Sequence, residues 1–326
     1  MKFARLSVLS ASLAIAACSG GGEFGGTFGG GGSSATTYVI TSANATTAAR
    51  ASWEAALNSG NFGGAGGVPG LSASTPGDFS KATRAPGSSV FLVNVMQKVP
   101  FGPVEELCFV SGSITTSGDV ADPLTLTTGD TFQVVSDACD DGFGEVVNGT
   151  IDFTVREFTG DLLAGTYLLS MDTVLTDFQV ATESDTIVSN GDVTLTLDTT
   201  DTPFIEAGVS GTRMTVDYNA ISETLSNYVS NQTLDGGDQA LPFTMTGAGT
   251  LNSSELNGII QYSTPVIFAG VGFEYPSSGS LLVEGKDSAA RLTAVDNVNI
   301  TIEVDTNGDG TWDETIETTW AELAAS

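Results

Sequence analysis

The sequence contains no histidine, and this gap excludes several classes of site. Ser-His-Asp and Cys-His nucleophilic machinery, His-ligated zinc and His-ligated haem all need an imidazole. The chain also lacks the phosphate-binding pattern G-x-x-x-x-G-K-[S/T]. We therefore interpret the protein as non-catalytic. A carboxylate-dependent glycan hydrolase stays an alternative, because 39 Asp and Glu residues can supply two carboxylates at a suitable distance.

Basic residues are scarce as well. Only 10 Lys and Arg stand against 39 Asp and Glu, which gives a formal net charge of −29. The basic residues are scattered and form no basic stripe, so we expect no binding to nucleic acid or to bare anionic lipid. The acidity has two interpretations: it keeps the protein soluble, or it attracts divalent cations.

Cysteine is rare, and its three positions differ in context. Cys108 and Cys139 can pair in an oxidising compartment, which leaves Cys18 as an odd thiol unless another group occupies it. A bridge between Cys108 and Cys139 would stabilise the fold by roughly 3–4 kcal/mol in the chain-entropy model. Paired cysteines also leave no thiolate for redox chemistry.

The apolar run near the N-terminus, Leu6–Ala17, is too short to cross a bilayer as a helix and follows the basic Lys2 and Arg5. This pattern is typical of an export signal. The run ends in Ile-Ala-Ala-Cys at Cys18, which resembles the lipobox of bacterial lipoproteins. The resemblance implies cleavage before Cys18, acylation of its thiol and new amino terminus, and a membrane as partner. Ordinary signal-peptidase cleavage after Ala16 is the alternative.

The residue after the lipobox indicates which membrane the lipoprotein would reach. Ser19 resembles lipoproteins forwarded to the outer membrane rather than those retained at the inner one. Several acyl chains would make an effectively permanent tether, since each buried methylene contributes about 0.8 kcal/mol. We therefore expect a protein anchored by lipid in the outer membrane, on its periplasmic side or at the cell surface.

Composition divides the chain into three parts. Residues 1–17 are the expected signal peptide, and residues 18–34 are the lipidated cysteine with a flexible Gly-rich linker. Residues 35–326 are expected to form a single β-rich domain, with an N-terminal helical segment at about 35–105.

Two helices are predicted in the N-terminal segment. The spacing in TTAARASWEAAL, residues 46–57, predicts a helix that ends at Asn-Ser-Gly, residues 58–60. Residues 60–88 are rich in Gly, Pro and Ser and predict a long loop. Residues 88–100 favour a second helix, although the alternation of their apolar side chains also fits a strand.

Beyond Leu107 the hydrophobic period changes to two, as in GTIDFTVREF and GDVTLTLD. Threonine alternates with Val, Leu, Ile and Phe, which indicates strands with one dry face. Turn signals are expected between the strands at Asn148-Gly149, Asn190-Gly191, Asp235-Gly236 and Asn257-Gly258. We predict a mainly β fold, a long antiparallel meander curled into a half-barrel, a barrel or a sandwich.

The motif DTNGDGTWDE, at residues 305–314, has two interpretations. Acidic and amide side chains at alternate positions, with Gly310 for a sharp turn, predict a weak calcium loop between strands. Its ligands would be the side chains and one carbonyl of Asp305, Asn307, Asp309, Thr311 (carbonyl) and Asp313. The twelfth position is Ile316 instead of the bidentate Glu of an EF-hand, so an ion-free turn is the alternative.

The stretches LCFVSGSIT, TTGDTFQVVSDACDDGFGEVVNGTIDFTV and FEYPSSGSLLVEG resemble exported proteobacterial proteins to which no activity is assigned. The resemblance implies shared architecture only. Taken together, the sequence predicts a lipid-anchored envelope protein that acts as a structural or binding module, with a protein or glycan as a further partner. A carrier of a lipid or other hydrophobic ligand in a curved sheet is the main alternative, beside the glycan hydrolase. Cofactors are not expected, apart from structural calcium.

Overall fold

The computed structural model describes residues 38–61, 102–121, 126–140, 142, 144–161, 164–272 and 274–326. All elements described below belong to one compact unit, Ala35–Ser326. Cys18, the expected signal peptide and linker, and the helix expected at residues 88–100 lie outside the described residues, as does most of the expected loop before that helix.

The predicted N-terminal helix is present as α1, Ala45–Asn61. The side-chain oxygen of Asn44 accepts a hydrogen bond from the Thr41 N–H, 2.7 Å away, at the start of the helix. The helix continues past Asn58–Gly60, so the predicted end was wrong. The Asn-Ser-Gly signal misplaced this end because local helix propensity is only a weak guide to where a helix stops.

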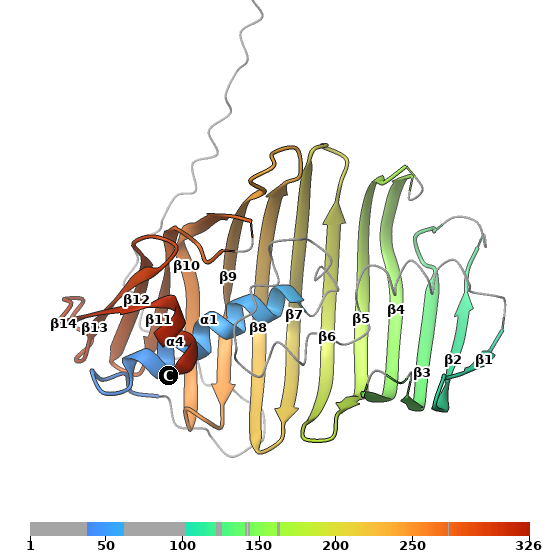
Figure 1. Cartoon of the computed structure of the whole chain (residues 1–326), viewed down its shortest axis with the longest axis horizontal. Coiled ribbons are helices and arrows are strands. Elements are labelled where there is room, and N and C mark those ends of the chain that lie inside the picture. Colours follow the sequence, from blue (N-terminus) through green and yellow to red (C-terminus); the bar gives the residue numbers. More distant parts are fainter. Residues whose placement is uncertain are drawn as a thin grey trace, which may run out of the picture. The chain divides into compact units, whose positions relative to one another are not determined.

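The predicted antiparallel meander is confirmed as one sheet of fourteen strands, each hydrogen-bonded to the next in the sequence (Figure 1). The sheet is open, with β1 and β14 at its edges, so the described residues form neither a closed barrel nor a two-sheet sandwich. The strands are β1 (Val104–Leu107), β2 (Ser111–Asp119), β3 (Thr131–Asp140), β4 (Val146–Asp161), β5 (Thr166–Ala181), β6 (Thr186–Asp198), β7 (Phe204–Tyr218), β8 (Ile221–Asp235), β9 (Pro242–Ser253), β10 (Gly258–Val271), β11 (Ser278–Gly285), β12 (Ser288–Ala294), β13 (Asn299–Asp305) and β14 (Glu314–Thr319).

Two of the four predicted turns are wrong. Asp235-Gly236 and Asn257-Gly258 lie at strand ends as expected, but Asn148-Gly149 lies inside β4 and Asn190-Gly191 inside β6. Both misplaced pairs sit at shifts in strand register, which are β-bulges. Gly149 and Gly191 have positive φ in these bulges, as glycine often has in tight hairpin turns, so the same Asn-Gly signal fits either structure.

These bulges belong to a line that crosses five consecutive strands. Every pairing from β2–β3 to β6–β7 contains a register shift. Each strand from β2 to β6 contributes one residue with positive φ to the line: Gly112, Ala138, Gly149, Asp177 and Gly191. A β-bulge bends its strand and increases the local twist, so a line of bulges creases the sheet across its strands.

Asparagine side chains hold this bulge line together. Asn148 accepts a hydrogen bond from the N–H of Ala138 on the preceding strand, and Asn190 accepts one from the N–H of Asp177, at 2.8 and 2.7 Å. A Cβ atom on Gly191 would lie 2.2 Å from the Arg213 carbonyl oxygen, so only glycine fits there. In each Asn-Gly pair, the asparagine therefore accepts a hydrogen bond from a backbone N–H displaced by the bulge, and the glycine allows the neighbouring strand to approach closely.

One face of the sheet is dry from β3 to β13. Paired positions in neighbouring strands carry buried apolar side chains, as in the row Met171, Leu195 and Val209. Helix α1 lies across this face over β7 to β10 (Figure 1). Its Ala56 packs on Gly247 of β9, where a Cβ would come within 3.1 Å of the Ala56 Cβ.

An aromatic cluster joins α1 to the short C-terminal helix α4, Trp320–Ala325. The Trp53 ring centroid lies 4.7 Å from that of Trp320 and 4.8 Å from that of Phe268 on β10. Tyr275 stacks on the other side of Trp320, with centroids 5.3 Å apart. Trp53, Phe268 and Trp320 are buried in the hydrophobic core, and the partly buried Tyr275 packs against it.

Candidate functional site

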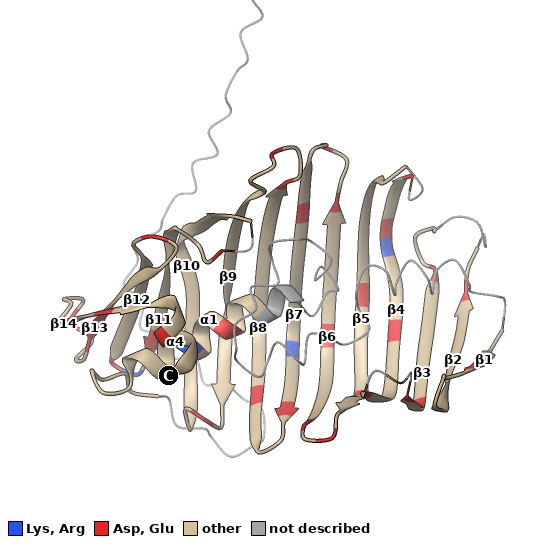
Figure 2. Cartoon of the chain, viewed as in Figure 1, with Lys and Arg blue, Asp and Glu red and all other residues tan. Residues whose placement is uncertain are grey.

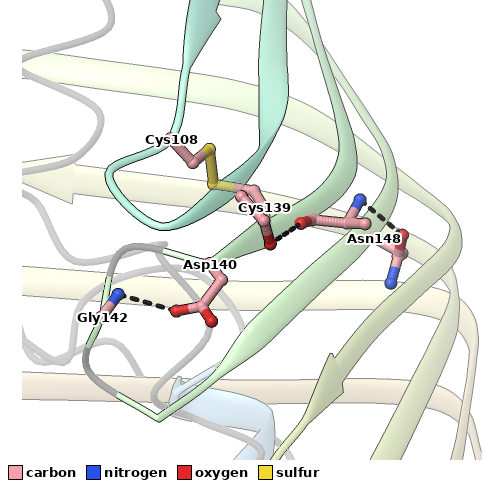
Figure 3. The surroundings of a disulfide bond; sticks show 7 residues. Cys108, Cys139, Asp140, Gly142 and Asn148 are labelled. Carbon is pink, nitrogen blue, oxygen red and sulfur yellow. Dashed lines mark hydrogen bonds between the residues drawn. A yellow bond between two sulfur atoms is a disulfide. The ribbon is translucent and has the colours of Figure 1, made fainter.

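The predicted disulfide is present and joins Cys108 to Cys139 (Figure 3). Cys108 directly follows β1 and Cys139 lies on β3, so the bridge spans β2, with Cα atoms 5.4 Å apart. The acidic stretch beside it forms a turn in which Asp140 accepts a hydrogen bond from the Gly142 N–H at 2.7 Å. The bridge therefore fastens the first edge of the sheet next to the bulge line.

The Asp-rich loop connects β13 to β14, and its centre is Asp305. One Asp305 carboxylate oxygen accepts hydrogen bonds from the N–H groups of Asn307 and Gly308, at 3.2 and 2.7 Å. The other accepts one from Gly310 at 2.8 Å. Burial raises the pKa of Asp305, but these backbone bonds outweigh it, and the pKa lies below its usual value.

The remaining predicted calcium ligands are also turned toward groups of the loop. Asn307 accepts a hydrogen bond from the Asp309 N–H, and Asp309 accepts one from the Thr311 N–H. Asp313 binds the N–H and the hydroxyl of Thr306, and the hydroxyl bond lowers the pKa of Asp313. The loop gathers the predicted side chains but directs them to its own donors, and the described residues contain no group of three or more acidic or cysteine side chains placed to hold a metal.

The face of the sheet opposite the helices is polar. Figure 2 shows Asp and Glu spread over the central strands, with few Lys or Arg among them. Cross-strand bonds satisfy part of this face: Arg156 pairs with Asp172, and the Thr194 hydroxyl donates to Asp172 at 2.7 Å. The alternation of threonine in the sequence therefore predicted this face correctly.

A depression of about 300 Å³ opens on the polar face across β6, β7 and β8. Its floor is Gly208, which pairs with Thr196 of β6 on one side and Asn231 of β8 on the other. A Cβ atom at position 208 would lie 3.2 Å from the Asn231 side-chain oxygen and 3.7 Å from the Thr196 Cβ. The depression exists because the central residue lacks a side chain.

Two carboxylates, Asp198 and Glu206, face each other across β6 and β7 at one end of the depression. The hydroxyl and the N–H of Thr200 both donate to Asp198, and these bonds lower the pKa of Asp198. Glu206 is exposed to solvent. A glycosidase needs one carboxyl kept protonated by an apolar surrounding, and neither member of this pair has one.

Beneath α1, on the dry side, lies a cluster of charged side chains. Arg50 of α1 pairs with Glu54 at 3.0 Å and also with Glu255, which follows β9. Glu223 of β8 accepts a hydrogen bond from the Ser253 hydroxyl at 3.0 Å. The pKa of Glu223 is raised to about 7, chiefly by burial and also by the charges of Glu54 and Glu255, although the hydrogen bond from Ser253 lowers it.

Sequence reasoning missed the depression and this cluster, although each left a signal. Gly208 is a glycine inside a strand, which marks a gap or a close approach. Glu223 has the same alternation phase as Leu225, so period two places it on the dry face.

The described residues include no helix long and apolar enough to cross a membrane. Comparison with known proteins adds no identity: no protein-family model matches the chain, and neither a curated protein nor a solved structure matches it.

Proposed function

We propose that the protein is a lipid-anchored, non-catalytic envelope protein that presents the polar face of its open sheet as a binding surface. The difference between the two faces of the sheet carries this proposal. Helix α1 covers the dry face from β7 to β13, whereas the opposite face keeps hydroxyl, amide and carboxylate groups in contact with solvent. No helix of the described residues covers this face or its depression, and such a face is available to a partner.

The sequence supports the proposed location. The lipobox-like leader supports acylation of Cys18 and an outer-membrane tether, and the Gly-rich residues 18–34 would hold the body away from the lipid. The described depression does not favour the alternative of a lipid carrier, because hydroxyl, amide and carboxylate side chains are interspersed among the apolar residues of its lining. The two carboxylates at its end lack the environment that acid catalysis needs, which favours binding over hydrolysis.

The tether is tested by comparing the wild type with Cys18→Ala in its own host or a related bacterium. We expect the wild type to enter the detergent phase on partitioning and to fractionate with the outer membrane. The alanine variant should stay in the aqueous phase with an unchanged thermal midpoint, because Cys18 lies outside the compact unit. An alanine variant that remains in the membrane fraction would refute the lipid anchor.

A further inference from the structure

The depression centred on Gly208 is a three-by-three grid of polar-face positions. Thr194, Thr196 and Asp198 of β6 stand beside Ser210, Gly208 and Glu206 of β7, and these stand beside Val229, Asn231 and Thr233 of β8. Strands lie about 4.8 Å apart and alternate residues about 7 Å apart, so the grid measures roughly 10 by 13 Å. This area suits a single small ring seated over the missing side chain.

Several polar side chains of the grid have no hydrogen-bond partner among the described residues. No hydrogen bond from another residue in the described part of the chain reaches the side chains of Thr196, Glu206, Ser210, Asn231 and Thr233. Hydroxyl groups both donate and accept, an amide does the same with two atoms, and a carboxylate only accepts. A complementary ligand must therefore carry several hydroxyl groups of its own.

The charges and the apolar surface of the grid further restrict the chemical class of the ligand. Asp198 and Glu206 are the only charged residues of the grid, and both are acidic, so an anionic sugar or a phosphate ester would be repelled. Val229 is 37% exposed and stands at the corner opposite Asp198, where it provides an apolar surface for ring C–H groups. Hydroxyl donors to a carboxylate make the stronger, charge-assisted bonds.

We infer that this depression binds one ring of a neutral carbohydrate, with Gly208 as the floor and Asn231, Thr196 and Glu206 as hydrogen-bonding walls. The inference rests on the proposed function of the polar face and names the chemical class of its ligand. It assigns the sugar to a site on the sheet itself, between strands, and involves no breaking of a glycosidic bond.

The test uses the full-length lipidated protein in a detergent without a sugar headgroup. Methyl glycosides of glucose, galactose and mannose serve as probes in saturation-transfer NMR and calorimetry. We expect at least one to bind, and Gly208→Val to weaken it by about tenfold or more, since the new side chain fills the floor. Glucuronate and glucose 6-phosphate, which carry a negative charge, should bind more weakly than the neutral probe.

Two further variants distinguish loss of the binding site from a general effect of added bulk on the sheet. Asn231→Ala removes a wall and should also weaken binding by about tenfold, without adding bulk to the strand. Ala269→Val adds similar bulk on β10, in the same row as Glu206 and Thr233 but outside the depression, and should bind like the wild type. Thermal melts of all three variants report whether each is folded.

The outcomes separate this inference from the proposed function. Absence of binding to every neutral probe, or equal binding by Gly208→Val in a folded protein, overturns the inference and leaves the lipid tether standing. Release of nitrophenol from the matching nitrophenyl glycosides, lost in Glu206→Gln, would overturn the non-catalytic proposal instead. Failure of Cys18→Ala to leave the membrane overturns the anchor without touching the sugar site.

Discussion

The two ends of the sheet are built on different principles. Strands β2 to β8 are mostly long, are creased by the bulge line up to β6, and carry the depression on their polar face. Strands β11 to β14 have six to eight residues each, pair without register shifts, and lie next to the aromatic cluster of α1 and α4. Both regions bury apolar side chains on the dry face, but the second adds the aromatic cluster, whereas the first adds asparagine caps and one disulfide.

The largest expected effect lies in the packed region. Trp320→Ala should lower the free energy of unfolding by about 3–5 kcal/mol, because the fully buried indole contacts rings from α1 and β10. Chemical denaturation measures the loss. Trp312→Ala is the matched control: its ring lies under Arg291, with 4.8 Å between the guanidinium carbon and the ring centroid, and should cost about 1 kcal/mol or less. Equal losses in both variants would contradict the packed-region description.

The disulfide should be nearly as important to the creased region. Replacing both Cys108 and Cys139 by serine should remove roughly 3–4 kcal/mol of stability by the loop-entropy argument. The near-ultraviolet circular dichroism of the Trp53–Trp320 cluster should persist at low temperature, since the bridge lies at the other edge of the sheet. A thermal midpoint that does not change in the double variant would show that the edge needs no bridge.

The charged cluster under α1 predicts that stability falls as pH rises. The pKa of Glu223 is about 7 in the folded protein and near 4.5 in an unfolded chain, so the folded state holds the extra proton between these values. Stability is then greatest below pH 4.5 as far as this group is concerned and is lost as pH rises through 7.

Glu223→Gln should abolish this part of the pH dependence. At pH values above the folded pKa the variant should be more stable than the wild type by about 2 kcal/mol, after allowance for solvent that still reaches the side chain. Denaturation curves at several pH values measure the difference. The exposed Glu317→Gln is the control, and its stability should vary with pH as in the wild type. If the stability of Glu223→Gln also varies with pH as in the wild type, Glu223 is not the group responsible.

A smaller effect is expected at the bulge line. Asn190→Ala leaves the Asp177 N–H without its acceptor and should cost about 1–2 kcal/mol. Asn252→Ala, on the unbulged stretch where β9 meets β10, removes an amide with no such task and should cost less than about 0.5 kcal/mol. Hydrogen exchange at Asp177 should accelerate in the first variant only. If the two variants lose equal stability, the asparagine cap has no special role.

The smallest effect is expected from calcium. Since the amide groups of the loop already engage Asp305, Asp309 and Asp313, millimolar calcium should leave the thermal midpoint unchanged in wild type and in Asp309→Ala. Melts with calcium and with chelator decide the matter. A rise in the midpoint that Asp309→Ala abolishes would establish the calcium loop in place of the ion-free turn.

Hydrophobic alternation, which reflects solvent exposure, predicted the fold. Features that depend on which strands pair, such as the bulges and the depression, were not predicted. Alternation located the strands from Val146 to Asp305 because half of each strand is dry, and the disulfide followed from cysteine parity. The Asn-Gly pairs misled because positive φ is common to turns and bulges. Gly208 signalled a gap in its strand, but the residues around the depression could not be foreseen, because they depend on the register that brings Gly208 beside Asn231.

The order of the strands has a consequence for how the chain folds during synthesis. Each strand pairs with the one synthesised just before it, so the sheet can grow strand by strand as the chain emerges, with little loop-closure cost at each step. Helix α1 is the exception, since it emerges before every strand yet packs mainly on β8 and β9. We expect its docking to be the late, slow event that completes the core.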